Sequence, residues 1–480
     1  MAAGPQTAID PRTPMDPRTR ALLDAPIGST LLRLALPNVI VMVVQSAIGL
    51  IETYFVAKLG TDALAGIALV FPILMLVQMV SAGAMGGGIL SAIARALGSG
   101  KREEANGLVW HAVAIALALG IATTVLALSG GPFLYRLMGG SGGSLAAAAT
   151  YSNIIFAGAI LLWLYNSLAA IIRGAGNMVL PASVTAINAL ILLPLSPALI
   201  FGWGFLPRLG IAGGAAAVIF FYAVGSLVFI AYLWSGRGVL HPQFRPARLR
   251  WAPLADILRI GAISSLISVS TNIIIGAATG FVGSFAAAAV AGYGTGARLE
   301  YVLVPLVFGL GSPLATMVGT AIGAGQRARA LRVTWTGAAI AALMTEAIGI
   351  AAALAPQAWL GLFSHDPLMN ATGTQYLHIV GPFYGFYGLG LALYFASQGA
   401  GKLTWPLRVA MLRLVVAAGG GWLALHLMPG NIAAVFAALS IGMFIFGAMN
   451  ALAITLGAWF GRDRGRPASL RPQPVATLSD

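Results

Sequence analysis

The feature that most constrains this chain is a succession of long apolar stretches, separated by short segments rich in Gly, Pro and charged residues. Each stretch is long enough to cross the ~30 Å hydrocarbon core of a bilayer, which needs about 20 helical residues. Only 8% of the 480 residues are charged, whereas soluble globular proteins have roughly 25%. The pattern predicts an all-α integral membrane protein with twelve transmembrane helices, at about residues 31–57, 63–97, 104–129, 145–172, 178–202, 211–235, 257–281, 286–322, 330–355, 371–398, 403–427 and 432–460.

The basic residues indicate the orientation of these helices. With the N-terminus inside, 23 of the 27 Lys and Arg lie on or near the cytoplasmic side, while Lys58, Arg136 and Arg208 lie outside and Arg298 lies within a span. This is the positive-inside bias of membrane proteins. It explains the net charge of +14 as a topology signal, with contact to anionic membrane lipids as a secondary interpretation, and it argues against nucleic-acid binding. Both termini are therefore expected in the cytoplasm, and the Arg-, Ala- and Gly-rich composition is typical of a GC-rich bacterium, which points to the inner (plasma) membrane.

Both ends of the chain are expected to be tails. Residues 1–30 begin with a polar, Pro-rich stretch that has no apolar core of a signal peptide, so they are predicted to form a disordered cytoplasmic tail. Residues 461–480 are predicted to form a second cytoplasmic tail. The chain has no cysteine, so it has neither disulfides nor thiolate metal sites.

Short motifs recur at one offset and indicate an internal repeat. GSGKREEA at residues 98–105 matches GAGQRARA at 323–330, and GAGN at 174–177 matches GAGK at 399–402, all 225 positions apart. The pattern predicts two parallel six-helix repeats, an N-lobe over residues 31–235 and a C-lobe over 257–460, joined by a basic cytoplasmic linker over 236–256. Parallel repeats are typical of transporters in which one bundle rocks against the other around a central site.

Three acidic residues, Glu52, Glu300 and Glu346, lie inside apolar stretches. A charge at the centre of a bilayer costs about 2.5–3.5 kcal/mol on insertion scales, so such residues usually face a cavity and serve its function. Burial disfavours a charged carboxylate, which makes a proton switch possible. The alternative is a permanently protonated Glu that only hydrogen-bonds a neighbouring helix.

Glu52 has support from its own helix. Gln45 and Gly49 share roughly one helix face with it, and Pro37 removes a backbone hydrogen bond earlier in the same stretch. Pro37 could instead be a first-turn proline near the helix start.

Tyr293 and Arg298 are further candidates for a cavity or a gate. Arg298 stands two residues from Glu300, so on a helix the two point to different sides and a direct pair is not expected. No enzyme motif is present: GSGKRE does not fit a phosphate-binding loop, HExxH and GxSxG are absent, and the histidines have no metal-ligand spacing. The sequence therefore predicts no catalysis, no metal site and no cofactor.

The N-terminal stretches ALPNVIVMVVQSAIGLIETYFVAKLGTDALAGIAL, ARALGSGKREEA and RGAGNMVLP, together with AVAGYGTGARLEYVLVPLVFGLGSPLATMVGTAIGAGQRARA, resemble the MATE (multidrug and toxic compound extrusion) family. The resemblance implies a twelve-helix, two-lobe antiporter that exports small organic cations or amphipathic drugs in exchange for protons or sodium ions. It places Glu52 at the family's first-helix Asp and Pro37 at the proline associated with bending of that helix.

The departures from the family pattern concern the coupling ion. The seventh and tenth stretches lack the carboxylates of the family's C-lobe sodium site, and the fifth has Leu192 and Ser196 where many relatives have Asn and Asp. With Asn188 one turn earlier, the N-lobe ion site is reduced to Glu52, Gln45, Asn188 and Ser196. Sodium needs several oxygen ligands and a proton needs one group, so proton coupling is predicted over sodium coupling.

A sodium-coupled drug antiporter and a flippase for lipid-linked saccharides remain as alternatives at this stage. A monomer is expected.

Overall fold

The structure is a computed structural model that describes residues 16–204, 206–245, 248–363 and 366–461; for residues 44–50, 52, 53, 287, 301 and 302 it describes the backbone alone. Within these residues every regular element is a helix. This follows from the apolar sequence, because in lipid a helix satisfies all of its own backbone hydrogen bonds.

The first half of the chain forms six spans. A short helix, α1 (Pro17–Asp24), precedes them. The spans are α2 (Ile27–Ala57); α3 (Thr61–Gln78) continued by a π-helical turn η1 (Met79–Met85) and α4 (Gly86–Gly98); α5 (Arg102–Leu137); α6 (Gly142–Ala157) with α7 (Ala159–Gly174), bent by 49° between them; α8 (Val179–Phe201); and α9 (Ile211–Trp234).

The second half repeats this order. Its spans are α10 (Trp251–Gly283); α11 (Ala287–Gly323); α12 (Arg327–Leu354); α14 (Pro367–Val380) continued by η2 (Gly381–Phe383) and α15 (Tyr384–Ala400); α16 (Thr404–Leu414) with η3 (Val415–Gly419) and α17 (Gly420–Leu427); and α18 (Ile432–Thr455), while a short helix α13 (Pro356–Leu360) lies between α12 and α14. The prediction of twelve spans in two six-helix repeats is confirmed.

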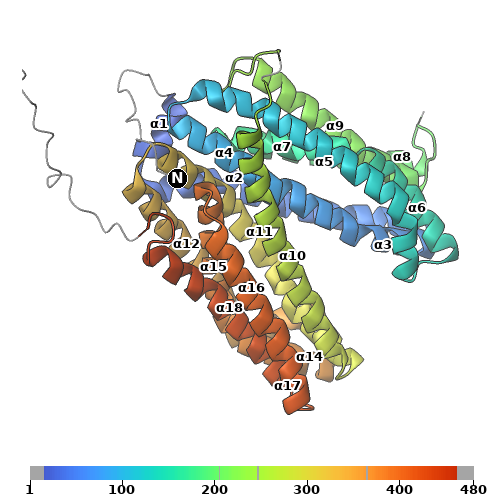
Figure 1. The fold of residues 1–480 in the computed structure, drawn as a ribbon. Coiled ribbons are helices and arrows are strands. Elements are labelled where there is room, and N and C mark those ends of the chain that lie inside the picture. The colour runs from blue at the N-terminus through green and yellow to red at the C-terminus, as the bar shows by residue number, and fades with distance from the viewer. Residues whose placement is uncertain (1–15, 205, 246–247, 364–365, 462–480) are drawn as a thin grey trace, which may run out of the picture.

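The two bundles meet at one end and diverge from there, the N-lobe toward the right and the C-lobe toward the bottom of Figure 1. We call the meeting point the joined end; it contains the ends of α4, α7, α11 and α15 and the turns at residues 99–101, 175–178, 324–326 and 401–403. The opposite end, with the turns at residues 58–60, 138–141, 202–210, 284–286 and 428–431, is called the far end.

Glycines of the repeated motifs lie in the turns of the joined end. Gly100 and Gly325, which are equivalent by the offset of 225, have φ of 75° and 71°. This left-handed backbone conformation is common directly after a helix and costs glycine little, because glycine has no Cβ.

The span α2 belongs to both lobes. Leu31 and Ala35 in its first part pack into the C-lobe core, and Val56 near its end packs with Ile200 of the N-lobe. Pro37 lies between these parts, inside the helix and not in its first turn. It therefore removes a backbone hydrogen bond where α2 passes from one lobe to the other.

Two predicted boundaries are wrong. The tail predicted over residues 1–30 is helical from Pro17, because the Asp16 side chain accepts the Arg18 N–H at 2.9 Å and Pro17 suits a first helical position. The linker ends before residue 256, because α10 begins at Trp251. Residues 1–15 and 462–480, which include most of the second predicted tail, lie outside the described residues.

Candidate functional site

The predicted ion-coupling residues of the first span lie in the second half of α2. Glu52 and Gln45 are among the residues whose side chains lie outside the described part of the structure, so only their backbone positions are known. This half of α2 packs against α8 of the N-lobe, the helix that contains the other two predicted N-lobe residues.

Asn188 and Ser196 are both buried in α8. Asn188 Nδ2 donates to the backbone oxygen of Phe221 at 3.0 Å, which ties α8 to α9. This contact gives Asn188 a packing role inside the N-lobe.

A second polar cluster in the N-lobe surrounds the π-helical turn η1. Asn166 Nδ2 donates to Ser81 Oγ at 2.8 Å and lies 3.4 Å from Gln78 Oε1, which also accepts from the Tyr222 hydroxyl at 3.3 Å. The cluster thus links the second, fourth and sixth spans. Turns of π-helix are frequent at functional sites. These residues were not selected from the sequence, although Gln78, Ser81 and Asn166, three uncharged polar residues in apolar stretches, were a usable signal.

Glu300 lies in the C-lobe among aromatic side chains. Its Oε1 accepts a hydrogen bond from the Tyr376 hydroxyl, and the Tyr376 ring packs edge-on against Tyr293 at 5.3 Å between centroids. The buried Arg413 lies within electrostatic range of Glu300 and stacks over the rings of Tyr387 and Phe446, each at 5.0 Å. Among the described residues no Lys or Arg forms an ion pair with Glu300. Tyr293 and Glu300, both predicted candidates, are therefore brought together through Tyr376.

Glu346 and Arg298, the other two predicted C-lobe candidates, have different partners. Glu346 Oε2 accepts the backbone N–H of Gly385 at 2.6 Å, at the start of α15. A carboxylate is stabilised there by the helix dipole, so this contact supports a structural role. Arg298 has an exposed side chain, and its guanidinium lies 5.7 Å from the Phe363 ring near the far end.

Equivalent residues of the two repeats form the joined end. A Cβ atom on Gly98 would collide with the Thr320 backbone oxygen, and one on Gly323 would collide with the Arg95 backbone oxygen. Gly98 and Gly323 are 225 positions apart, and so are Arg95 and Thr320. The contact between α4 and α11 is therefore nearly two-fold symmetric and needs glycine on both sides.

Hydrogen bonds between the lobes follow the same symmetry. Ser91 Oγ donates to the Gly399 backbone oxygen at 2.9 Å, and Thr316 Oγ1, at the position equivalent to Ser91, donates to the Arg173 backbone oxygen at 3.1 Å. Both acceptors lie at the end of the fourth span of a repeat. Each lobe thus offers one hydroxyl to the other.

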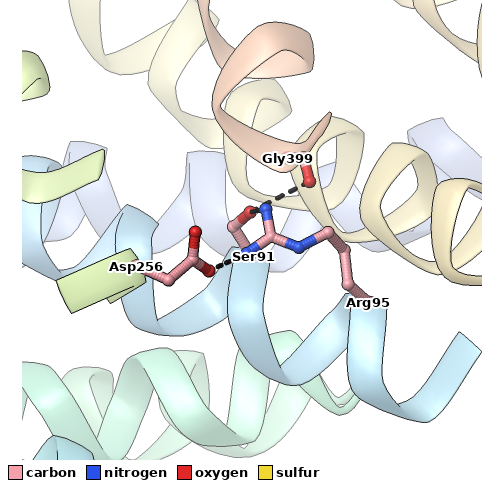
Figure 2. Close-up of polar contacts among 4 residues, drawn as sticks. All are labelled: Ser91, Arg95, Asp256 and Gly399. Atoms are coloured by element: carbon pink, nitrogen blue, oxygen red, sulfur yellow. Dashed lines mark hydrogen bonds and ion pairs between the residues drawn. The ribbon is translucent and has the colours of Figure 1, made fainter. Parts of the chain in front are cut away.

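One ion pair breaks this symmetry (Figure 2). Arg95 of α4 donates to Ser91 Oγ at 2.8 Å and forms an ion pair with Asp256 of α10 at 2.5 Å. The positions equivalent to Arg95 and Asp256 in the other repeat are Thr320 and Leu31, which cannot form such a pair. The pair therefore connects the lobes on one side of the pseudo-symmetry axis only.

The helix α1 also touches both lobes at the joined end. The Arg329 guanidinium of α12 donates to the backbone oxygens of Leu22, at 3.0 and 3.2 Å, and Ala25, at 2.7 Å. On the other side, Arg18 Nη1 donates to the Tyr232 hydroxyl of α9 at 3.2 Å. Leu22 is buried, so α1 is a packed bridge.

Comparison with known proteins identifies the architecture. The MatE family model matches the chain twice, over residues 37–198 and 261–423. These two matches cover most of the chain and reproduce its repeat. The chain belongs to the MatE family.

Named relatives of this MatE-family chain include a transporter and a probable multidrug resistance protein. The FAD transporter of Shewanella oneidensis is 31% identical over 381 residues, which cover 78% of this chain and 82% of that protein. A probable multidrug resistance protein NorM of Thermotoga maritima is 26% identical over 393 residues, covering 80% and 82% of the two chains.

Solved structures confirm the MatE fold. A multidrug resistance MATE family transporter of the MOP superfamily, in an outward-facing conformation, has a TM-score of 0.83 at 23% identity and covers 93% of this chain and 98% of its own. A MOP superfamily transporter from Pyrococcus furiosus has a TM-score of 0.84 at 23% identity, with the same coverage. The predicted family and fold are both confirmed.

The residues that hold the two MatE lobes together were not among those selected from the sequence. Gly98, Gly323 and Gly399 were found only as members of the repeated motifs. Ser91 and Asp256 gave no signal, because a hydroxyl in an apolar stretch and an acid near a connection are both common.

Proposed function

We propose that this protein is a secondary active exporter that moves cationic or amphipathic organic compounds out of the cell in exchange for protons. The observation that carries the proposal is the joining of the lobes at one end only, through contacts between equivalent residues of two repeats. A pair of repeats joined in this way can rock about the contact and expose a central site to one side at a time.

We place the joined end in the cytoplasm. Most basic residues of the described spans and connections lie at that end, whereas the far end has Lys58, Arg136 and Arg208, and Arg298 lies near it. The positive-inside rule then puts the far end outside. In this orientation the divergent lobes represent an outward-facing state, and closure of the far end with opening of the joined end gives the inward-facing state.

We assign the proton-coupling role to Glu52, on a helix that packs against both lobes. Protonation from outside removes a charge that attracts a cationic substrate, and bending at Pro37 would transmit this change to the C-lobe contacts of α2. Two solved structures with a TM-score of 0.84 are described as MATE in the bent and in the straight conformation, so this fold adopts more than one conformation.

The driving force depends on the charge of the exported compound. For a neutral compound, inward movement of one proton through 100 mV releases about 2.3 kcal/mol, which supports a gradient of roughly fifty-fold because each 1.4 kcal/mol corresponds to a factor of ten. Exchange of one proton for one monovalent cation moves no net charge, so the pH gradient or a second proton drives export of such a cation. Sodium coupling would supply the same electrical free energy per ion, but a sodium site would need more oxygen ligands around Glu52.

Ethidium efflux from cells that lack their own pumps tests this proposal. Wild type is expected to export ethidium in sodium-free buffer and to stop when a protonophore is added, and Glu52→Gln is expected to abolish export. The exposed Glu103 of α5 provides a matched control, since Glu103→Gln should leave efflux unchanged. Export that requires sodium, or full activity of Glu52→Gln, would contradict proton coupling through this residue.

Export of a flavin nucleotide is a second candidate function, because the named FAD transporter is 31% identical over 78% of this chain. FAD is an anionic amphipath, and it would need basic groups in the transport path, where the exposed Arg298 is one candidate. Release of FAD into the medium by expressing cells, measured by fluorescence, separates the two functions. FAD release without ethidium efflux would favour this candidate. Absence of both activities would favour a lipid-linked substrate.

A further inference from the structure

An apolar groove lies between α5, α7 and α9 of the N-lobe. It has a volume of about 520 Å³, within the range of ligand pockets, which is roughly 300–1,000 Å³. Every residue that lines it is apolar or aromatic, including Leu117, Leu168, Ala231 and Phe244. Leu117 and Phe244 are 41% and 82% exposed, so the groove opens onto the lipid-facing surface.

The linker between α9 and α10 forms one wall of the groove. Trp110 Nε1 of α5 donates to the backbone oxygen of Gln243 at 3.1 Å, and the Trp234 ring lies 5.7 Å from Trp110 and 6.3 Å from Phe244. Tryptophan and other aromatic residues gather at the level of the lipid headgroups. The groove therefore begins at that level and extends toward the bilayer core along α5 and α7.

The same linker places positive charge at the mouth of the groove. Arg245 directly follows the lining residue Phe244, and Arg237, Arg248 and Arg250 are also exposed. The described linker residues include no acid. The first turn of α5 contributes two acids, Glu103 and Glu104. Lys101 pairs with Glu104 at 3.5 Å, and Arg102 directly follows Lys101. The rim therefore remains strongly basic.

We propose that the groove binds an anionic phospholipid, with an acyl chain against the apolar lining and the phosphate against the linker arginines. An acyl chain gains free energy by burial in proportion to its length, and basic residues at the membrane surface attract anionic headgroups. No polar side chain lines the groove to hold a polar solute, which favours a hydrocarbon chain over a drug-sized amphipath. This site is separate from the transport function proposed above and does not depend on it.

Native mass spectrometry of the full chain, purified after mixing with phosphatidylethanolamine and phosphatidylglycerol, tests the proposal. Wild type is expected to retain phosphatidylglycerol. Each arginine should contribute about fivefold to this preference, so the double variant Arg245→Gln/Arg248→Gln should lower it by more than tenfold. Arg208→Gln, at the far end, is the matched control and should retain lipid as wild type does.

A second variant tests the hydrocarbon part of the site. Ala231→Trp fills the groove and should remove the retained lipid, whereas Val228→Trp, on an exposed part of α9 outside the lining, should not. Retention that survives both the arginine and the groove variants would overturn the proposal. Loss of lipid in Ala231→Trp together with equal retention of both lipids by wild type, or with an unchanged phosphatidylglycerol preference in the arginine variant, would overturn the contact between these arginines and an anionic headgroup.

Discussion

Single atoms decide how closely the lobes meet. At Gly98 the absence of a Cβ lets α4 approach the backbone oxygen of Thr320, and at Gly323 the same holds for Arg95. Small residues allow such close helix packing in membranes, where helices have no hydrophobic driving force to associate. The joined end therefore depends on steric fit more than on buried apolar area.

Gly98→Ala is expected to shift the protein away from the closed joined end, because the added methyl group must push the helices apart. We expect a cost of about 1–3 kcal/mol, typical of overpacking. The chain has no native cysteine, so cross-linking of Lys101→Cys with Gln326→Cys across the joined end measures the shift. Gly276→Ala is the control: a Cβ there meets nothing within 4 Å, and a yield that falls equally in both variants would contradict the steric explanation.

Asp256→Asn removes the asymmetric ion pair with Arg95 between the lobes. Its side chain is 50% exposed and that of Arg95 is 20% exposed, and an exposed pair contributes only about 0–1 kcal/mol. We expect at most a fivefold change in the open-to-closed ratio, seen as a modest loss of the same cross-link. Glu103→Gln, which removes an exposed acid that forms no ion pair among the described residues, is the control and should leave the cross-link yield unchanged. A tenfold change in Asp256→Asn would mean that the pair is far stronger than its exposure allows.

At the scale of elements, two helices connect the lobes in different ways. The span α2 continues from the C-lobe core into the N-lobe with Pro37 between its two parts. The short α1 lies across the joined end and is held by hydrogen bonds on both sides. A change in the angle between the lobes must therefore bend α2 and displace α1 from one of its partners.

Arg329→Gln should release α1 from the C-lobe, because the three hydrogen bonds to Leu22 and Ala25 then lose their charged donor. Hydrogen bonds to charged groups contribute about 1.5–3 kcal/mol each when buried, and less at this half-buried site. The expected result is faster labelling of Leu22→Cys by a water-soluble thiol reagent. Arg332→Gln, an exposed basic residue on the same helix, should leave the labelling rate unchanged; equal acceleration in both would indicate a general effect of charge.

For the whole molecule, the joined and far ends should move in opposite directions. Spin labels at Lys101 and Gln326 should report short distances when labels at Lys58 and Ser284 report long ones. Substrate and pH conditions that drive transport should redistribute both pairs together, because rigid lobes rock about one contact. Movement at one end alone would indicate local loop motion and would argue against alternating access.

Much of this architecture could be predicted from the sequence. The apolar stretches predicted the spans, because lipid leaves a helix as the only way to satisfy the backbone of a single segment. The offset of 225 predicted the repeat and is confirmed by the paired contacts of Gly98 and Gly323. Glu52, Gln45, Asn188 and Ser196 stay predictions as an ion site, since only the last two have described side chains.

Only the tertiary structure decided which residues meet across the lobes. Ser91 and Gly399 are 308 positions apart, and Arg95 and Asp256 are 161 apart, so no local pattern could pair them. Residues 17–24 read as part of a disordered tail because their composition is polar, and their order comes from partners on α9 and α12 that the local sequence does not contain. The physical reason is the same in each case: hydropathy and helix periodicity are properties of one segment, whereas a contact between helices depends on the angle at which two segments pack.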